Sequence, residues 1–166
     1  MSDFVVHALT VGGGILALCP LPGRGGAYAA DLAHLKEWKP SMLISLVTEV
    51  EFLAEGATTL GADISDAGSR WAHLPITDYG VPDEAFIEQW PEVRDAALAA
   101  LRGGGRVLVH CMGGCGRSGM VMLRLMIEAG EAPDQALARL RQARPCAIET
   151  EAQMHWAKTG RLLRGG

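Results

Sequence analysis

Short apolar segments alternate with helical segments along this chain, and the alternation constrains the fold more than any other feature. Ile15 to Cys19, Met42 to Val47 and Trp71 to Ile76 have the length and composition of buried strands. Arg106 to His110 is a further strand, and Phe4 to Ala8 is a candidate edge strand. Parallel strands need crossover connections, which are usually helices. The order therefore predicts a mainly parallel α/β sheet with helices on both faces, a three-layer α/β/α fold.

Apolar spacing and capping signals predict the helices between these strands. Two capping boxes, a T-x-x-E pattern at Thr48 and a T-x-x-Q pattern at Thr150, mark helix starts. The expected helices cover Gly26 to Lys39, Thr48 to Ala54, Asp83 to Leu101, Arg117 to Ala129, Pro133 to Ala143 and Thr150 to Leu163. Ligands of such sheets bind beyond the carboxyl ends of the strands, so we expect a site there.

Length and charge restrict the function. The 166 residues are the size of one domain, expected over 1–166, and 15 basic residues against 19 acidic ones without a basic cluster argue against nucleic acid. Apolar runs of about seven residues are too short to span a membrane. The N-terminus lacks the positive region of a secretory signal, and four cysteines without zinc-like pairing favour a reducing cytoplasm over a disulfide framework.

The stretch HCMGGCGRSG, beginning at His110, combines a cysteine at a strand end with a loop of small residues. If a helix begins near Arg117, the loop must curl tightly, which glycines permit. Its backbone N–H groups would then surround a tetrahedral anion above the helix N-terminus. The same field would stabilise a thiolate and make Cys111 a nucleophile. The phosphate-binding residues of this loop are Met112, Gly113, Gly114, Cys115 and Gly116.

Three side chains beside the loop have expected roles. The planar guanidinium of Arg117 would hold two phosphate oxygens at once. Ser118 would donate a hydrogen bond to the Cys111 sulfur and make it a better leaving group. We expect His110 to be buried and to hydrogen-bond the loop backbone rather than to transfer a proton itself.

His110, Cys111, Arg117 and Ser118 match the HC-x5-R-[ST] signature, so the chain resembles the protein tyrosine phosphatase superfamily from about Ile15 to Trp156. The resemblance is strongest to the compact dual-specificity-like members, particularly the kinase-associated and Cdc14-like phosphatases. It implies hydrolysis of phosphate monoesters through a phosphocysteine, without a metal or another cofactor. The implied substrate is a phosphorylated protein or peptide, carrying phosphotyrosine and also phosphoserine or phosphothreonine.

Cleavage also requires an acid that protonates the leaving oxygen. In the resembled family this acid follows a strand about 30 residues before the cysteine, which matches Asp78 in the segment TDYGVPDE. Asp83 is the rival, but its place before a helical segment suits a helix cap better. The family often positions the hydrolytic water with a Gln before the last helix, and here Glu149 and Gln153 occupy that region.

Other residues near the loop have ordinary explanations beside functional ones. Arg24 would lie near the cleft and attract an acidic substrate, or it is a plain loop residue. Glu51 is accounted for by its capping box. Cys115 is placed to form a disulfide with Cys111 under peroxide, and Cys146 is a comparable candidate for such a redox partner.

Three alternatives remain beside a protein phosphatase. A rhodanese-type sulfurtransferase usually has one residue fewer between cysteine and arginine, and needs no acid such as Asp78. A non-catalytic phosphate-binding module would have lost Cys111, Arg117 or Asp78. A phosphatase for a phosphoinositide or a small metabolite ranks lower than one for proteins, because the loop contains no Lys to meet neighbouring phosphates.

Overall fold

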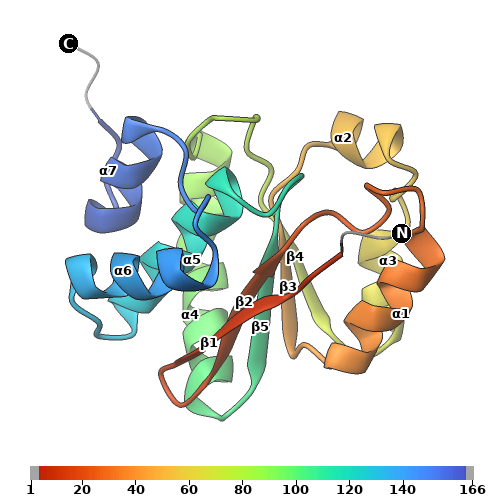
Figure 1. Ribbon diagram of the computed structural model, residues 1–166, viewed down its shortest axis with the longest axis horizontal. Helices are drawn as coiled ribbons and strands as arrows, with labels where there is room; N and C mark the ends of the chain where they lie inside the picture. The colour runs from red at the N-terminus through yellow and green to blue at the C-terminus, as the bar shows by residue number, and fades with distance from the viewer. Residues whose placement is uncertain (1–3, 164–166) are drawn as a thin grey trace.

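The computed structural model describes residues 4–163, and in it a five-stranded sheet lies between two groups of helices (Figure 1). The structure does not describe residues 1–3 and 164–166. They belong to the domain expected over 1–166, and residues 1–3 are part of the N-terminal stretch discussed above. The strands are β1 (His7–Val11), β2 (Gly14–Cys19), β3 (Met42–Ser45), β4 (Arg70–His73) and β5 (Arg106–His110). The helices are α1 (Tyr28–Trp38), α2 (Glu49–Ala54), α3 (Leu60–Asp66), α4 (Glu84–Arg102), α5 (Gly116–Glu128), α6 (Pro133–Ala143) and α7 (Glu151–Thr159).

The sheet has the strand order β1-β2-β5-β3-β4, with β5 in the middle. Strands β2, β5, β3 and β4 are parallel, and only β1 is antiparallel to its neighbour. His110, the last residue of β5, is in register with Cys19 on one side and Ser45 on the other. Three strands therefore end at one level, and Cys111 follows the central one.

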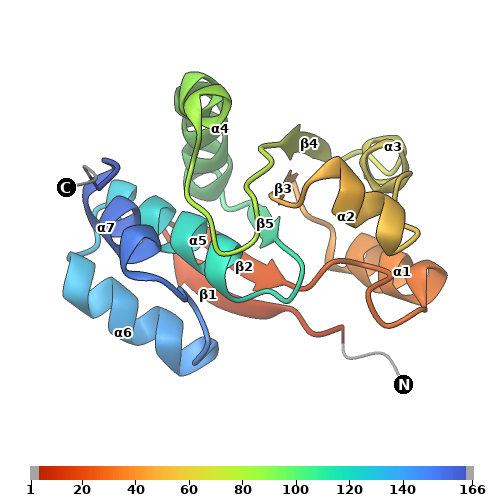
Figure 2. The same ribbon diagram turned by 90° about the horizontal axis from the view of Figure 1, so that it is seen from above.

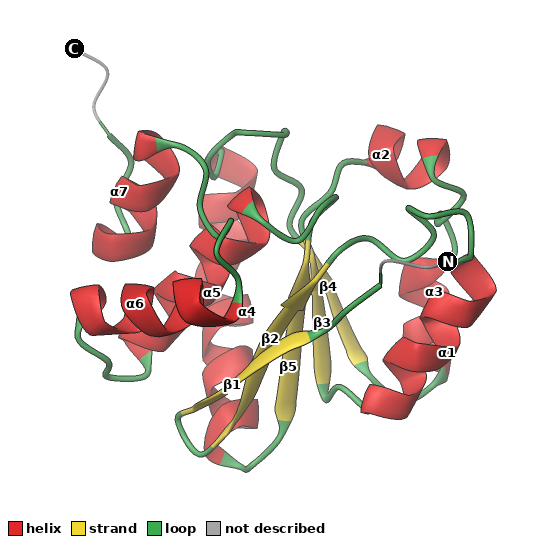
Figure 3. Ribbon diagram, viewed as in Figure 1, coloured by secondary structure: helices red, strands yellow, loops and turns green. Residues whose placement is uncertain are grey.

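Helices cover both faces of the sheet, as expected. Helices α1, α2 and α3 lie on one side, and α4 to α7 lie on the other (Figures 2 and 3). Val107, Leu108 and Val109 of β5 are fully buried between the layers. Helix α5 contacts β2, β5, α6 and α7, and its first eleven residues are buried. The helix that begins directly after the Cys111 loop is thus fixed by packing along most of its length.

The boundaries of several elements differ from the predictions. The edge strand lies at His7–Val11 rather than Phe4 to Ala8, because Gly12 and Gly13 (φ 59° and 94°) form the hairpin turn that sets its register with β2. No sequence pattern predicted α3, a seven-residue helix on which Gly61 packs tightly beneath the Trp71 ring. Within residues 4–163, no helix is long and apolar enough to cross a membrane.

Candidate active site

Cys111 lies directly after β5, at the carboxyl end of the sheet, and only 2% of its surface is exposed. The Ser118 hydroxyl oxygen lies 3.1 Å from its sulfur. Both groups are held by well-packed elements, since β5 precedes Cys111 and the first turn of α5 carries Ser118. The expected nucleophile and the expected hydrogen-bond donor to it are therefore in contact.

Every backbone carbonyl from His110 to Cys115 accepts a hydrogen bond. Backbone N–H groups bind three of these carbonyls: Leu46 donates to His110 (3.0 Å), Leu21 to Met112 (3.0 Å), and Gly119 and Ile148 to Cys115 (2.9 and 3.3 Å). Side chains bind the other three: His110 Nδ1 donates to Cys111 (3.2 Å), and Arg144 donates from Nη2 to Gly113 and from Nε to Gly114 (3.0 Å each). A planar trans peptide directs its N–H away from its carbonyl. The N–H groups of Met112 to Cys115 have no hydrogen-bond partner among residues 4–163. They are free to bind an anion.

A cavity of about 210 Å³ opens beside this loop. Its lining consists of Arg24, Asp78, Tyr79, Cys111, Met112, Gly113, Cys115, Gly116, Arg117 and Glu149. Gly114 is the one expected loop residue that does not line it. At Gly114 φ is +72°, and a Cβ there would lie 2.9 Å from the carbonyl carbon of Cys19, so glycine is required for close packing against the end of β2.

The Arg117 guanidinium is almost fully buried and is paired with Glu51. Its Nη1 and Nη2 donate to the two carboxylate oxygens of Glu51 at 2.7 and 2.8 Å, and Nη1 also donates to the carbonyl of Ile76 at 2.8 Å. The guanidinium has five N–H groups, so Nε and one hydrogen of Nη2 remain. This edge is the fork that would hold a phosphate.

Sequence reasoning missed the second role of Glu51. Its carboxylate does accept from the Thr48 N–H at 3.0 Å, as the capping box predicts, but it also orients Arg117. Partial burial alone would raise the pKa of Glu51, but hydrogen bonds from Arg117 and Thr48 hold it below its ordinary value. Glu51 lies 66 positions before Arg117 in the sequence, and the capping box already explains why a glutamate occupies this position. Nothing in the HC-x5-R motif indicates that Glu51 pairs with Arg117.

His110 is fully buried, and its hydrogen bonds determine its tautomer. Burial lowers the pKa of His110 to about 4, so the ring is neutral at pH 7. Since Nδ1 faces the carbonyl of Cys111 and must donate, Nε2 accepts from the Ser45 hydroxyl at 2.6 Å. Ser45 in turn accepts from the indole N–H of Trp71 at 2.8 Å. This chain from β4 through β3 fixes the peptide next to the nucleophile.

The two candidate acids occupy different environments. Asp78 lines the cavity, its side chain is 58% exposed, and one of its oxygens lies 3.5 Å from Arg117 Nη2. Asp83 accepts from the Phe86 N–H at 2.9 Å as the N-cap of α4 and does not line the cavity. Of the two carboxylates, only Asp78 lines the cavity that Cys111 and Arg117 also line.

Of the residues expected to position water, Glu149 lines the cavity and Gln153 does not. The Gln153 side chain is buried, accepts from the N–H groups of Glu149 and Thr150, and donates to the Gly80 carbonyl at 3.0 Å. It therefore links the Asp78 loop to the segment before α7. Arg24, for which the sequence left both a substrate-attracting role and a plain loop role open, is exposed and lines the cavity.

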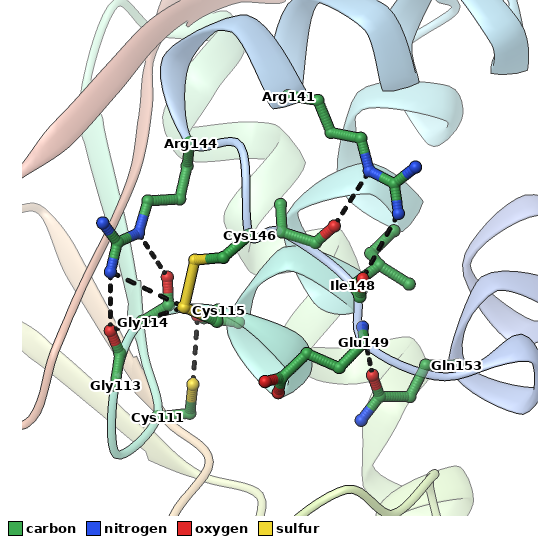
Figure 4. Close-up of a disulfide and its surroundings, with 12 residues drawn as sticks. Cys111, Gly113, Gly114, Cys115, Arg141, Arg144, Cys146, Ile148, Glu149 and Gln153 are labelled. Carbon is green, nitrogen blue, oxygen red and sulfur yellow. Dashed lines mark hydrogen bonds between the residues drawn. A yellow bond between two sulfur atoms is a disulfide. The ribbon is translucent and has the colours of Figure 1, made fainter.

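Cys115 forms a disulfide with Cys146, not with Cys111 (Figure 4). Cys19 and Cys111 are free. The sequence favoured free cysteines and a reducing compartment because no pairing was visible, but Cys115 and Cys146 are 31 residues apart and meet only through the packing of α5 against α6 and α7. The cysteine pattern thus no longer supports a cytoplasmic location. Within residues 4–163, no three His, Cys, Asp or Glu side chains are grouped to hold a metal ion.

Comparisons with known proteins agree with this geometry. Residues 18–131 match the family described as "Polymorphic toxin system, DSP-PTPase phosphatase". Human cyclin-dependent kinase inhibitor 3 is 34% identical over 150 residues, covering 85% of this chain and 69% of the relative. The chain belongs to the dual-specificity-type protein tyrosine phosphatases. It is accordingly a cysteine-dependent phosphatase, and the sulfurtransferase alternative is set aside.

Two solved structures superpose over 90% or more of the chain. Kinase associated phosphatase, crystallised with its catalytic-site cysteine replaced by serine, has a TM-score of 0.83 at 25% identity, covering 97% of this chain and 96% of that one. The structure named Tk-PTP in the active form has a TM-score of 0.69 at 29% identity, covering 90% and 92%. The phosphatase fold expected from the sequence is confirmed.

The pairing of Arg117 with Glu51 generates the first prediction. Glu51→Gln keeps one acceptor for Thr48 but removes the charge and one acceptor from Arg117, so kcat/KM for an aryl phosphate should fall roughly 10- to 100-fold. The control is Thr48→Ala, which weakens the same helix cap but leaves both bonds to Arg117. Equal losses of kcat/KM in the two variants, at equal Tm, would mean that helix stability and not Arg117 orientation is responsible.

Proposed function

We propose that this phosphatase hydrolyses phosphorylated proteins or peptides through a phosphocysteine on Cys111, with Asp78 as the general acid. The observation that carries the proposal is the phosphate loop itself. Its carbonyls are all engaged, its N–H groups are free, and Cys111 and Arg117 face one cavity. This arrangement can bind three oxygens of a phosphoryl group while the sulfur attacks the phosphorus.

In the first step the Cys111 thiolate forms a bond to phosphorus, and the bond from phosphorus to the substrate oxygen breaks. Negative charge spreads over the equatorial oxygens, and the loop N–H groups and the free edge of Arg117 stabilise it. The leaving oxygen takes a proton from Asp78. Asp78 lines the same cavity as Cys111 and Arg117, which supports this assignment because a general acid must lie within hydrogen-bond reach of the group that it protonates.

In the second step water attacks the phosphocysteine and releases inorganic phosphate. Asp78, now ionised, accepts a proton from that water. The Ser118 hydroxyl, 3.1 Å from the sulfur, stabilises the thiolate as it leaves. Glu149 at the cavity rim is a further group that can orient the water, whereas both ends of the Gln153 amide are already hydrogen-bonded.

The charges around the cavity support a substrate that places one phosphate group in the site rather than several. Arg117 and Arg24 are the basic residues of the lining, and Asp78 and Glu149 oppose them. A polyphosphorylated headgroup would need more cations. Tyr79, 63% exposed at the rim, offers an aromatic surface to a phosphotyrosine ring. The name kinase associated phosphatase likewise connects the superposed structure with a protein partner.

A substrate comparison tests this proposal. With a chelator present, kcat/KM should be highest for phosphotyrosine peptides, lower for phosphothreonine peptides and at least about tenfold lower for phosphoinositides and inositol phosphates. A preference for an inositol phosphate would contradict the assignment to protein substrates.

The acid assignment is tested by a matched pair of variants. Asp78→Asn should lower kcat by roughly 10²- to 10⁴-fold and flatten its fall at alkaline pH. Asp83→Asn keeps a capping side chain and should leave kcat and its pH profile within about twofold. If Asp83→Asn changes the profile and Asp78→Asn does not, the acid is misassigned.

A further inference from the structure

We propose that Arg144 and the Cys115–Cys146 disulfide form a redox-controlled clamp that holds the phosphate loop in its anion-binding shape. The proposal rests on the proposed function, since the anion is the phosphoryl group that Cys111 attacks. In it Arg144 is a positioning residue that never touches the substrate. The disulfide joins the loop to the segment that carries this arginine.

Arg144 grips the outer side of the loop. Its Nε donates to the Gly114 carbonyl and its Nη2 to the Gly113 carbonyl, both at 3.0 Å, and Nη2 also lies 3.6 Å from the Cys115 sulfur (Figure 4). Within residues 4–163, two side chains donate hydrogen bonds to the carbonyls from His110 to Cys115. One is His110, which belongs to this stretch itself, and the other is Arg144. One guanidinium therefore fixes two consecutive peptides.

Those two peptides carry the N–H groups of Gly114 and Cys115. Because each peptide is planar, holding the carbonyl outward turns the N–H inward. A charged donor on the carbonyl also polarises the amide and strengthens the N–H as a donor on the other side. Glycine adopts the φ of +72° at Gly114 without side-chain strain but does not itself restrict the backbone, so the bonds from Arg144 add a restraint that the residue lacks.

The disulfide keeps Arg144 at the loop. Cys146 follows Arg144 by two residues, and its Cα lies 5.2 Å from that of Cys115, which is itself a loop residue and the N-cap of α5. Arg141 braces the same segment from α6 by donating to the carbonyls of Ala147 and Ile148 at 3.1 and 3.2 Å, but it makes no hydrogen bond to the phosphate loop. Arg141 thus provides a control for Arg144.

The redox step is ordinary disulfide chemistry. A dithiol gives two electrons and two protons to the Cys115–Cys146 bond and becomes a disulfide, leaving two thiols. A phosphine gives two electrons and becomes a phosphine oxide, with one water supplying its oxygen and the two protons. Cys146 is exposed, so the bond is accessible. Cys111 takes no part, and while the clamp is closed no Cys115 thiol is available to it. Oxidation of this pair should therefore favour activity, although Cys111 itself must stay reduced.

The test measures tungstate binding to the Cys111→Ser variant, which removes the nucleophile from the redox chemistry. Protein purified without reductant should contain two thiols fewer than after reduction, with Cys115 and Cys146 in one crosslinked peptide by mass spectrometry. Reduction with a phosphine should weaken tungstate binding at least about threefold by calorimetry, because the loop loses preorganisation. Cys146→Ser in the same background should bind weakly without any reductant.

Arginine variants separate positioning from stability. Arg144→Met should weaken tungstate binding roughly tenfold, with Arg144→Lys intermediate because one carbonyl bond and the charge can persist. Arg141→Met should lower Tm by a similar amount and leave tungstate affinity unchanged. Equal loss of affinity in Arg141→Met and Arg144→Met would overturn the positioning role.

The remaining outcomes are also decisive. Three thiols in the Cys111→Ser variant purified without reductant would overturn the clamp, as would a disulfide whose reduction leaves tungstate affinity unchanged. Failure of tungstate to bind in either redox state would instead overturn the anion site of the proposed function.

Discussion

A planar peptide cannot direct its carbonyl and its N–H to the same side, and the active site is built on this constraint. Six consecutive carbonyls from His110 to Cys115 are hydrogen-bonded, and the donors come from β2, β3, β5, α5 and the segment between α6 and α7 or their flanking residues. The free N–H groups of the loop are the result. The surrounding fold thus shapes the anion site by satisfying the opposite side of the backbone.

The second element of the site is a buried charge held in one orientation. Burial acts to lower the pKa of Arg117, but Glu51 and the neighbouring Cys111 raise it above its ordinary value, so the guanidinium remains charged. Glu51 uses one edge of the guanidinium and leaves the other toward the cavity. In the proposed reaction the phosphate would meet a fork that needs no rearrangement, which is how preorganised donors stabilise a transition state.

Local sequence signals predicted much of this molecule. Strand alternation revealed the layers, and the capping boxes located the starts of α2 and α7. Spacing within one loop predicted Cys111 as the nucleophile and Arg117 as the phosphate-binding arginine. The partners of that loop were not predicted, because Glu51, Arg144 and Cys146 come from elements far away in sequence and each has an unremarkable local context. Helix α3 was missed for a related reason, since its packing on Trp71 decides its place.

The central claim is that Cys111 becomes covalently phosphorylated during turnover. The most direct measurement quenches Ser118→Ala with acid during hydrolysis of an aryl phosphate, because without the Ser118 hydroxyl the thiolate leaves slowly and the intermediate accumulates. Mass spectrometry should find one phosphoryl group on the peptide that contains Cys111, and none when Cys111→Ser is added. Continued hydrolysis by Cys111→Ser, or turnover without a phosphorylated Cys111 peptide, would contradict the account.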